Sequence, residues 1–144
     1  MRKVTIGASL FVLLLCAASA TAQSGNWVSG GTFRAIGGSG TFYIDQNSVV
    51  KNGDHVIFWV MLVWDQEEPW SGAKKFVEKE EAILSNPRQI RQLEVYHYDR
   101  ENKEFEHSAF PLGYHRPTTN EDPEIDLALK YAKEGKDTGP HPTP

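Results

Sequence analysis

The stretch Val56-Ile57-Phe58-Trp59-Val60-Met61-Leu62-Val63-Trp64 decides the fold of this 144-residue chain. It is uninterrupted by polar residues and rich in β-branched and aromatic side chains, which favours a strand over a helix. The preceding Asn52-Gly53 pair is a strong turn signal. Because side chains alternate along a strand, one face carries Ile57, Trp59, Met61 and Val63, and the other carries Val56, Phe58, Val60, Leu62 and Trp64. Both faces are apolar, so both need to be covered.

Shorter segments on either side indicate further strands. Residues 32–36 suit a short edge strand, residues 41–45 are β-rich, and residues 88–99 alternate as a strand does. Residues 104–110 fit a returning strand after a polar turn. Residues 73–84 are ambiguous, because their apolar positions have helical spacing while their length also permits a long exposed strand.

The last element is predicted to be a helix. Asp122 can cap its start, Pro123 suits the first helical position, and Gly135 supplies a stop. Its apolar positions have helical spacing at Ile125, Ala128, Leu129 and Ala132. We therefore expect an α+β fold, a single antiparallel β-sheet of about five to six strands with a C-terminal α-helix packed on it.

The N-terminus reads as a secretory signal peptide over residues 1–22. Arg2 and Lys3 precede an apolar run over residues 6–18, which is shorter than the roughly 20 residues of a membrane span. Small residues ending at Ala22 suggest cleavage after that position. The protein is thus expected to be exported, periplasmic or associated with the cell envelope, with no transmembrane span after cleavage.

Three segments are expected beyond the signal peptide. Residues 23–40 form a glycine- and serine-rich N-terminal segment, residues 41–135 form the domain, and the proline-containing tail at 136–144 is expected to be disordered. Cleavage removes the single cysteine, Cys16, so a disulfide or a cysteine-based metal site is not expected. The net charge of −4 becomes more negative without the basic leader, which argues against binding to nucleic acid.

The second apolar face of the long strand is the candidate binding or interface surface. A single helix covers only part of one face, so loops, a second copy of the chain, a protein partner or a ligand must cover the rest. Aromatic rings near polar groups can also bind small molecules by stacking. The candidate residues are Trp59, Met61, Trp64, Trp70, Tyr96 and Tyr98.

No catalytic, cofactor-binding or metal-ligating residues are predicted, and no enzyme activity is expected. The five histidines lack a metal-binding spacing. Glutamate groups such as those at 78–81 are explained by charged strand edges. The segment 37–41 has neither the final glycine nor the strand-to-helix context of a serine nucleophile motif.

The order of elements resembles the bacterial surface-adhesin protein E family. The matching segments are Phe42-Tyr43-Ile44-Asp45 with Ser48-Val49, then Phe58-Trp59-Val60, and Arg91-Gln92-Leu93 leading to Tyr98-Asp99. The resemblance covers residues 26–133 and implies an exported protein of a Gram-negative bacterium, with an antiparallel sheet flanked by helix. It also favours a strand for residues 73–84. Ser85 and a position near Ala132 stand where many relatives have cysteines, so the helix would be held by packing alone.

Two functions lead from the sequence, and a third, a hydrolase, is less favoured because a nucleophile and a base cannot be paired. The first is a non-enzymatic envelope protein, adhesin-like by resemblance, that binds a protein partner or forms a homodimer through its sheet. The alternative is a periplasmic small-molecule binding protein that uses an aromatic cluster of Trp59, Trp64, Tyr96 and Tyr98.

Overall fold

The computed structural model describes residues 23–137, 139 and 141–144, and the predicted signal peptide lies outside them. The described residues form β1 (Gln23–Ser24), β2 (Trp27–Ala35), β3 (Gly38–Asp45), β4 (Val50–Asn52), β5 (His55–Trp64), β6 (Lys75–Ile83), β7 (Gln89–Tyr98), β8 (Glu104–Ser108), α1 (Glu121–Leu129), β9 (Lys133–Glu134) and β10 (Pro142–Thr143).

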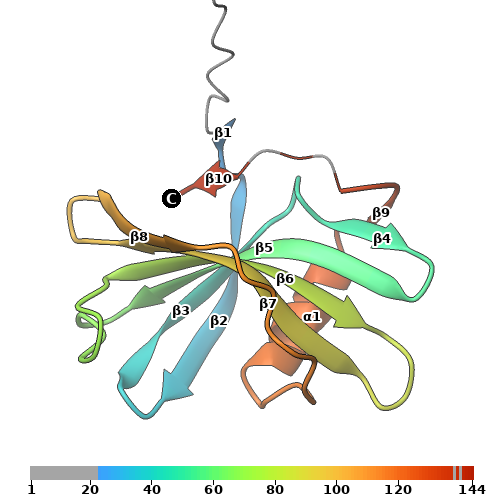
Figure 1. The fold of residues 1–144 in the computed structure, drawn as a ribbon, viewed down its shortest axis with the longest axis horizontal. Coiled ribbons are helices and arrows are strands. Elements are labelled where there is room, and N and C mark those ends of the chain that lie inside the picture. The colour runs from blue at the N-terminus through green and yellow to red at the C-terminus, as the bar shows by residue number, and fades with distance from the viewer. Residues whose placement is uncertain (1–22, 138, 140) are drawn as a thin grey trace, which may run out of the picture.

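An eight-stranded sheet dominates the described residues (Figure 1). Its strands follow the order β2-β3-β5-β6-β7-β8 with antiparallel neighbours, while β4 pairs with β5 and β9 pairs parallel with β4. β1 and β10 form a separate parallel pair. The expected antiparallel sheet with one helix is confirmed, but the sheet is larger than the expected five to six strands.

The glycine-rich N-terminal segment accounts for part of this difference. Its residues form β2 and begin β3, so the expected boundary between residues 40 and 41 lies inside β3. A Cβ atom at Gly30 would lie 2.0 Å from the Phe42 ring, and one at Gly40 would lie 2.2 Å from the Val63 carbonyl oxygen. These glycines allow neighbouring elements to approach closely within the sheet. A glycine-rich composition, taken alone, predicts a loop instead.

The ambiguous segment at 73–84 contains a strand, as the resemblance implied. β6 pairs with β5 along its whole length, from His55 opposite Ile83 to Val63 opposite Lys75. The long apolar strand is therefore central, with β3 on one side and β6 on the other.

The helix is confirmed, but its ends differ from the prediction. Glu121 and Thr118 form reciprocal backbone-to-side-chain hydrogen bonds of 2.7 and 3.3 Å, which is the capping-box arrangement, so Asp122 does not cap the helix. The helix ends at Leu129, well before Gly135, because Lys133 and Glu134 pair with β4. A membrane-spanning length of apolar helix does not occur anywhere in the described part of the chain.

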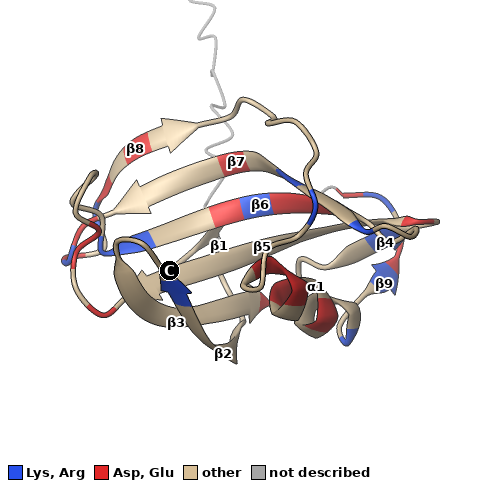
Figure 2. Cartoon of the chain, turned by 90° about the horizontal axis from the view of Figure 1, so that it is seen from below, with Lys and Arg blue, Asp and Glu red and all other residues tan. Residues whose placement is uncertain are grey.

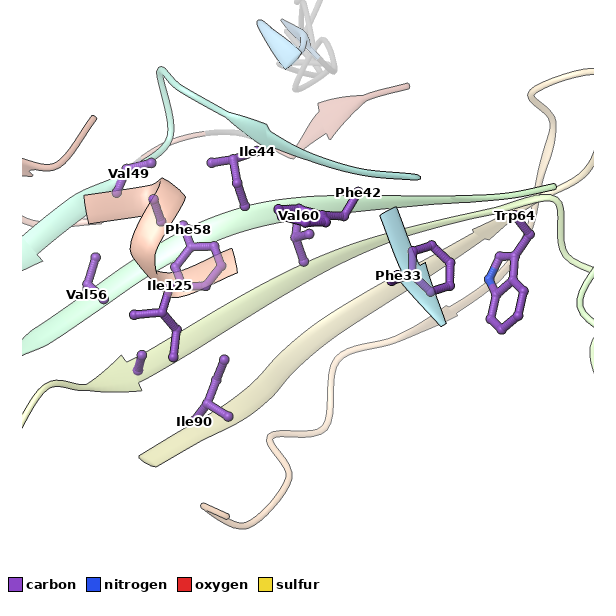
Figure 3. Packing of buried hydrophobic residues seen from close by; sticks show 12 residues of the cluster. Phe33, Phe42, Ile44, Val49, Val56, Phe58, Val60, Trp64, Ile90 and Ile125 are labelled. Atoms are coloured by element: carbon purple, nitrogen blue, oxygen red, sulfur yellow. The ribbon is translucent and has the colours of Figure 1, made fainter. Parts of the chain in front are cut away.

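The two faces of the sheet carry separate apolar clusters, as the alternation along β5 predicts. We call the face that packs on α1 the helix face (Figures 1 and 2). Its cluster includes Phe58, Val60 and Ile125, all fully buried (Figure 3). The opposite outer face carries a smaller cluster that contains Trp59 and Met61.

The described part of the tail differs from the expected disorder. β10 pairs with β1, and the indole Nε1 of Trp27 donates a 2.9 Å hydrogen bond to the carbonyl oxygen of Thr143. Lys79 forms an ion pair with Asp137. These residues pack on the apolar outer face. The prediction of disorder used only the composition of the tail and took no account of this surface.

Candidate functional site

The candidate residues predicted from the sequence do not form one site. Trp59, Met61, Tyr96 and Tyr98 lie together on the outer face. Trp64 belongs to the cluster on the helix face, where its ring meets Phe33 edge-on at 5.0 Å between centroids. The expected joint cluster of Trp59 and Trp64 is therefore wrong, because the two residues lie on opposite faces of β5.

Trp70 stands apart from both clusters. It lies in the connection between β5 and β6, and 73% of its surface is exposed. Its backbone nitrogen donates to Glu68, whose buried carboxylate also accepts bonds from the backbone and hydroxyl of Ser71. This carboxylate organises the loop, and Trp70 does not extend the aromatic cluster.

The outer face is organised around a stack of three rings. His107 and His141 stack on Tyr96 with centroid distances of 3.9 and 3.7 Å and interplanar angles of 8° in both cases. His141 also lies 5.2 Å from Trp59, and its Nε2 is 2.7 Å from the Tyr98 hydroxyl. The chain's own tail therefore occupies this aromatic surface.

Burial changes the acid–base properties of the stack. Burial lowers the pKa of His141, which favours the neutral imidazole. Burial also raises the pKa of Tyr98 to about 12, so its hydroxyl keeps its proton at neutral pH. The neutral rings of the outer face lie beside charged groups, because Lys79 lies over the Trp59 ring and Glu94 accepts a hydrogen bond from the Tyr96 hydroxyl.

A cavity of about 180 Å³ lies on the helix face. We call it the glutamate cavity, because four carboxyl side chains line it together with aromatic and aliphatic groups. Its lining residues are Phe33, Ala35, Leu62, Trp64, Glu78, Glu80, Thr118, Asn120, Glu121 and Glu124. They come from β2, β5, β6, α1 and the turn before α1, so the cavity forms where the helix meets the sheet. Figure 2 shows acidic residues on both α1 and β6.

Two of the carboxyl groups are deeply buried. Glu80 is 4% exposed and Glu124 is 3% exposed. Burial, and repulsion from neighbouring glutamates, raise the pKa of both well above the usual value. Burial also raises the pKa of Glu78 to about 7, although a hydrogen bond with Gln92 acts in the opposite direction. Glu78 is thus close to the balance between a neutral acid and a carboxylate at neutral pH, and burial favours the neutral, hydrogen-bond-donating form of Glu80 and Glu124.

Glu121 differs from the other three carboxyl groups. It accepts a bond from the Thr118 backbone and lies 2.9 Å from His115 Nε2. Its partners hold it at the start of α1, where the helix dipole favours a negative charge. The carboxyl groups left to meet a ligand are those of Glu78, Glu80 and Glu124.

Two buried polar atoms of residues that line the glutamate cavity have no hydrogen-bond partner among the described residues. They are Glu80 Oε2 and Trp64 Nε1. Figure 3 shows the Trp64 indole beside the Phe33 ring on the helix face. Buried polar atoms without partners are rare and costly, so each calls for a physical explanation, such as a group from outside the chain that supplies the missing bond.

The phase of the glutamates in the sequence is a signal for this cavity, although charged side chains are usually read as exposed. Glu78 and Glu80 alternate in phase with Phe76 and Ala82, which lie in or against the helix-face core. Our reading of the glutamates at 78–81 as charged strand edges is therefore wrong, because β6 lies between β5 and β7 and both Glu80 and Glu81 are buried. Glu124 directly precedes the buried Ile125, but only the docking of the helix brings it to β6.

No group of three or more histidine, cysteine, aspartate or glutamate side chains within the described residues is arranged to hold a metal ion. The glutamate cavity is also lined by aromatic and aliphatic side chains, which offer little to a hydrated metal ion.

Comparison of the chain with protein-family models, with curated proteins and with solved structures finds no match. The resemblance to the surface-adhesin protein E family therefore stays a prediction from the sequence.

Proposed function

We propose that this chain is an exported, non-enzymatic binding protein that holds a small molecule in the glutamate cavity. The observation that carries the proposal is the pair of buried polar atoms, Glu80 Oε2 and Trp64 Nε1, that belong to residues lining one cavity and have no partner among the described residues. The proposal keeps the small-molecule alternative from the sequence but moves it from the outer face to the helix face.

The shape of the cavity supports a small ligand. A cavity of about 180 Å³ is slightly larger than one of about 150 Å³ that binds benzene. Ligand sites are commonly apolar clefts with a few convergent polar groups, and this lining has that composition. Export rests on the predicted signal peptide at residues 1–22.

A thermal-shift panel tests the proposal. Cationic, neutral and anionic compounds of up to about ten non-hydrogen atoms are added to the mature chain, because ligands that bind the native state raise its Tm. We expect at least one compound to raise the Tm of the wild type and of Trp70→Phe, the exposed control. The same compound should have a smaller effect on Trp64→Phe.

A second variant guards against misfolding of Trp64→Phe. Ala35 is exposed at the end of β2 yet lines the glutamate cavity, so Ala35→Phe should narrow the cavity without disturbing the buried core. A panel without any hit, or hits unchanged in both Trp64→Phe and Ala35→Phe, would contradict the proposed function.

A second candidate is self-association through the outer face. It is favoured by the aromatic residues Trp59, Tyr96 and Tyr98, over which the chain's own His141 lies. If the tail leaves, this surface becomes available to a second copy of the chain. The effect of removing the tail distinguishes this candidate from ligand binding in the glutamate cavity.

A further inference from the structure

We infer that the ligand of the glutamate cavity is a small organic cation, namely a protonated amine with an apolar body and an acceptor oxygen. This inference rests on the proposed function and names the chemical class of its ligand. Charge, lining and the two unpartnered atoms each point to this class.

The charge of the lining selects a cation. Four glutamates line the cavity, and its lining, which consists of described residues only, includes no lysine, arginine or histidine. The charges that act on Glu78, Glu80 and Glu124 are those of other glutamates. His115 is the only histidine that contacts one of the four within the described residues, and it pairs with Glu121. The described lining therefore offers no positive charge to pair with an anionic ligand, whereas each of its glutamates can pair with a cation once it is ionised.

The rest of the lining selects an apolar body. Phe33 and Trp64 supply aromatic rings, and Leu62 supplies an aliphatic surface. Aromatic faces attract cations through the ring quadrupole, and they attract organic cations further by contact with carbon atoms. A bare divalent metal ion gains little from such walls.

The unpartnered atoms select the polar groups of the ligand. Glu80 Oε2 can accept a hydrogen bond from an ammonium group once the carboxyl is ionised. Trp64 Nε1 is a donor only, so it requires an acceptor such as a hydroxyl oxygen. The two residues also lie apart along the sheet, because Glu80 pairs with Phe58, six positions before Trp64 on β5. The ammonium and the oxygen should therefore lie at different ends of the ligand.

Proton release gives this inference a distinctive signature. Burial and repulsion favour the protonated form of Glu78, Glu80 and Glu124 in the empty cavity. A bound cation favours the ionised form, so binding should release protons to the buffer and should strengthen as the pH rises from 5.5 to 7.5. A neutral ligand has no reason to do either.

Titration calorimetry with four matched probes tests the inference on the mature chain. Tyramine carries an ammonium, an aromatic ring and a phenolic hydroxyl. Tyrosol has a hydroxyl in place of the ammonium, and phenethylamine lacks the phenolic hydroxyl. The fourth probe, 4-hydroxyphenylacetate, is an anion. We expect tyramine to bind at least tenfold more tightly than tyrosol and more tightly than phenethylamine, and the anion not to bind. The heat of tyramine binding should differ between phosphate and Tris buffers, because the two buffers take up the released protons with different enthalpies.

Variants locate the effect in the cavity. Glu80→Gln should weaken tyramine at least tenfold and reduce the proton release, while leaving tyrosol unchanged. Glu101→Gln makes the same substitution in an exposed turn, and it should change neither the affinity for tyramine nor the proton release. Glu124→Gln serves as the second cavity variant if Glu80→Gln does not fold.

The failures of the two proposals are distinguishable. The inference would be overturned if tyrosol or 4-hydroxyphenylacetate bound as tightly as tyramine and if Ala35→Phe weakened that binding. Such a result would still support the proposed function, which is ligand binding in the glutamate cavity. Calcium chloride binding in place of tyramine would show a metal site and overturn the organic cation. Absence of binding by all four probes would also overturn the inference, while the wider thermal-shift panel still decides the proposed function.

Discussion

The hydroxyl of Tyr98 and Nε2 of His141 lie 2.7 Å apart, although the two residues are 43 positions apart in the chain. This hydrogen bond joins the end of β7 to the C-terminal tail on the outer face. His141 also stacks on Tyr96, so one side chain makes both a polar and an aromatic contact. The protonation state of this imidazole therefore contributes to the tail's attachment, together with the pairing of β10 with β1 and the hydrogen bond from Trp27 to Thr143.

Acidification should loosen the tail. Burial lowers the pKa of His141 in the docked state, so the released tail binds a proton more readily than the docked tail does. Docking is consequently most stable above the ordinary histidine pKa of about 6.5 and weakens as the pH falls below it. Hydrogen exchange of the backbone amides of His141 and Thr143, corrected for the intrinsic effect of pH, should be faster at pH 5 than at pH 7.5. His141→Gln has no titrating ring and should lose this difference. Equal protection of the wild type at both pH values would contradict the argument.

Removal of residues 137–144 should expose the aromatic outer face. The deletion uncovers Trp59 and Tyr96, which His141 contacts, and it breaks the ion pair between Lys79 and Asp137. We expect the shortened chain to self-associate in light scattering across a hundredfold concentration range, since exposed apolar patches drive association. Asp137→Asn, which removes only the ion pair, should remain like the wild type. A shortened chain that stays monomeric would argue against self-association through this face.

Much of the sheet was readable from local pattern. The alternation of β5 correctly predicted two apolar faces, and the turn at Asn52-Gly53 correctly preceded it, with Gly53 at a positive φ of 60°. The length of β2 could not be predicted from the sequence. Gly30 and Gly40 leave room for side-chain and backbone atoms of neighbouring elements, and this close approach exists only in the folded chain. Composition cannot distinguish a glycine that permits close packing from one that permits a loop.

The candidate site was less readable, for two physical reasons. Trp59 and Trp64 were grouped by residue type, although an odd separation of five positions places them on opposite faces of a strand. Glu80 and Glu124 come together only when α1 docks on β6, which is a tertiary event with no local signal. A glutamate in phase with buried apolar neighbours is the sequence feature that could have located the cavity.

The attachment of α1 should depend on Ile125. This side chain is fully buried against the helix-face cluster, and no disulfide supports the helix in the described residues, which contain no cysteine. Ile125→Ala should lower the free energy of unfolding by about 2–5 kcal/mol, from lost burial and the cavity left behind. Urea unfolding followed by circular dichroism measures the loss. Ile36→Ala, at a position 97% exposed, should change the free energy by less than about 0.5 kcal/mol. Similar values for the two variants would show that the helix contributes little to the core.

The buried glutamates should make the empty protein less stable as the pH rises. In the folded state, burial raises the pKa of Glu78 to about 7, and burial also raises the pKa of Glu80 well above the ordinary value of 4.5, so the folded chain holds protons that the unfolded chain has released. Their contribution is therefore complete below about pH 4.5 and is lost as the pH rises from there through the folded pKa values. Urea unfolding at pH 5.5 and pH 8 should show a lower free energy at pH 8 for the wild type. Glu80→Gln, which stays neutral, should be less affected by pH and more stable than the wild type at pH 8. Glu101→Gln, at an exposed turn, should keep the pH dependence of the wild type. If Glu80→Gln is instead destabilised at pH 8, the carboxylate is ionised in the empty cavity and a partner already holds it.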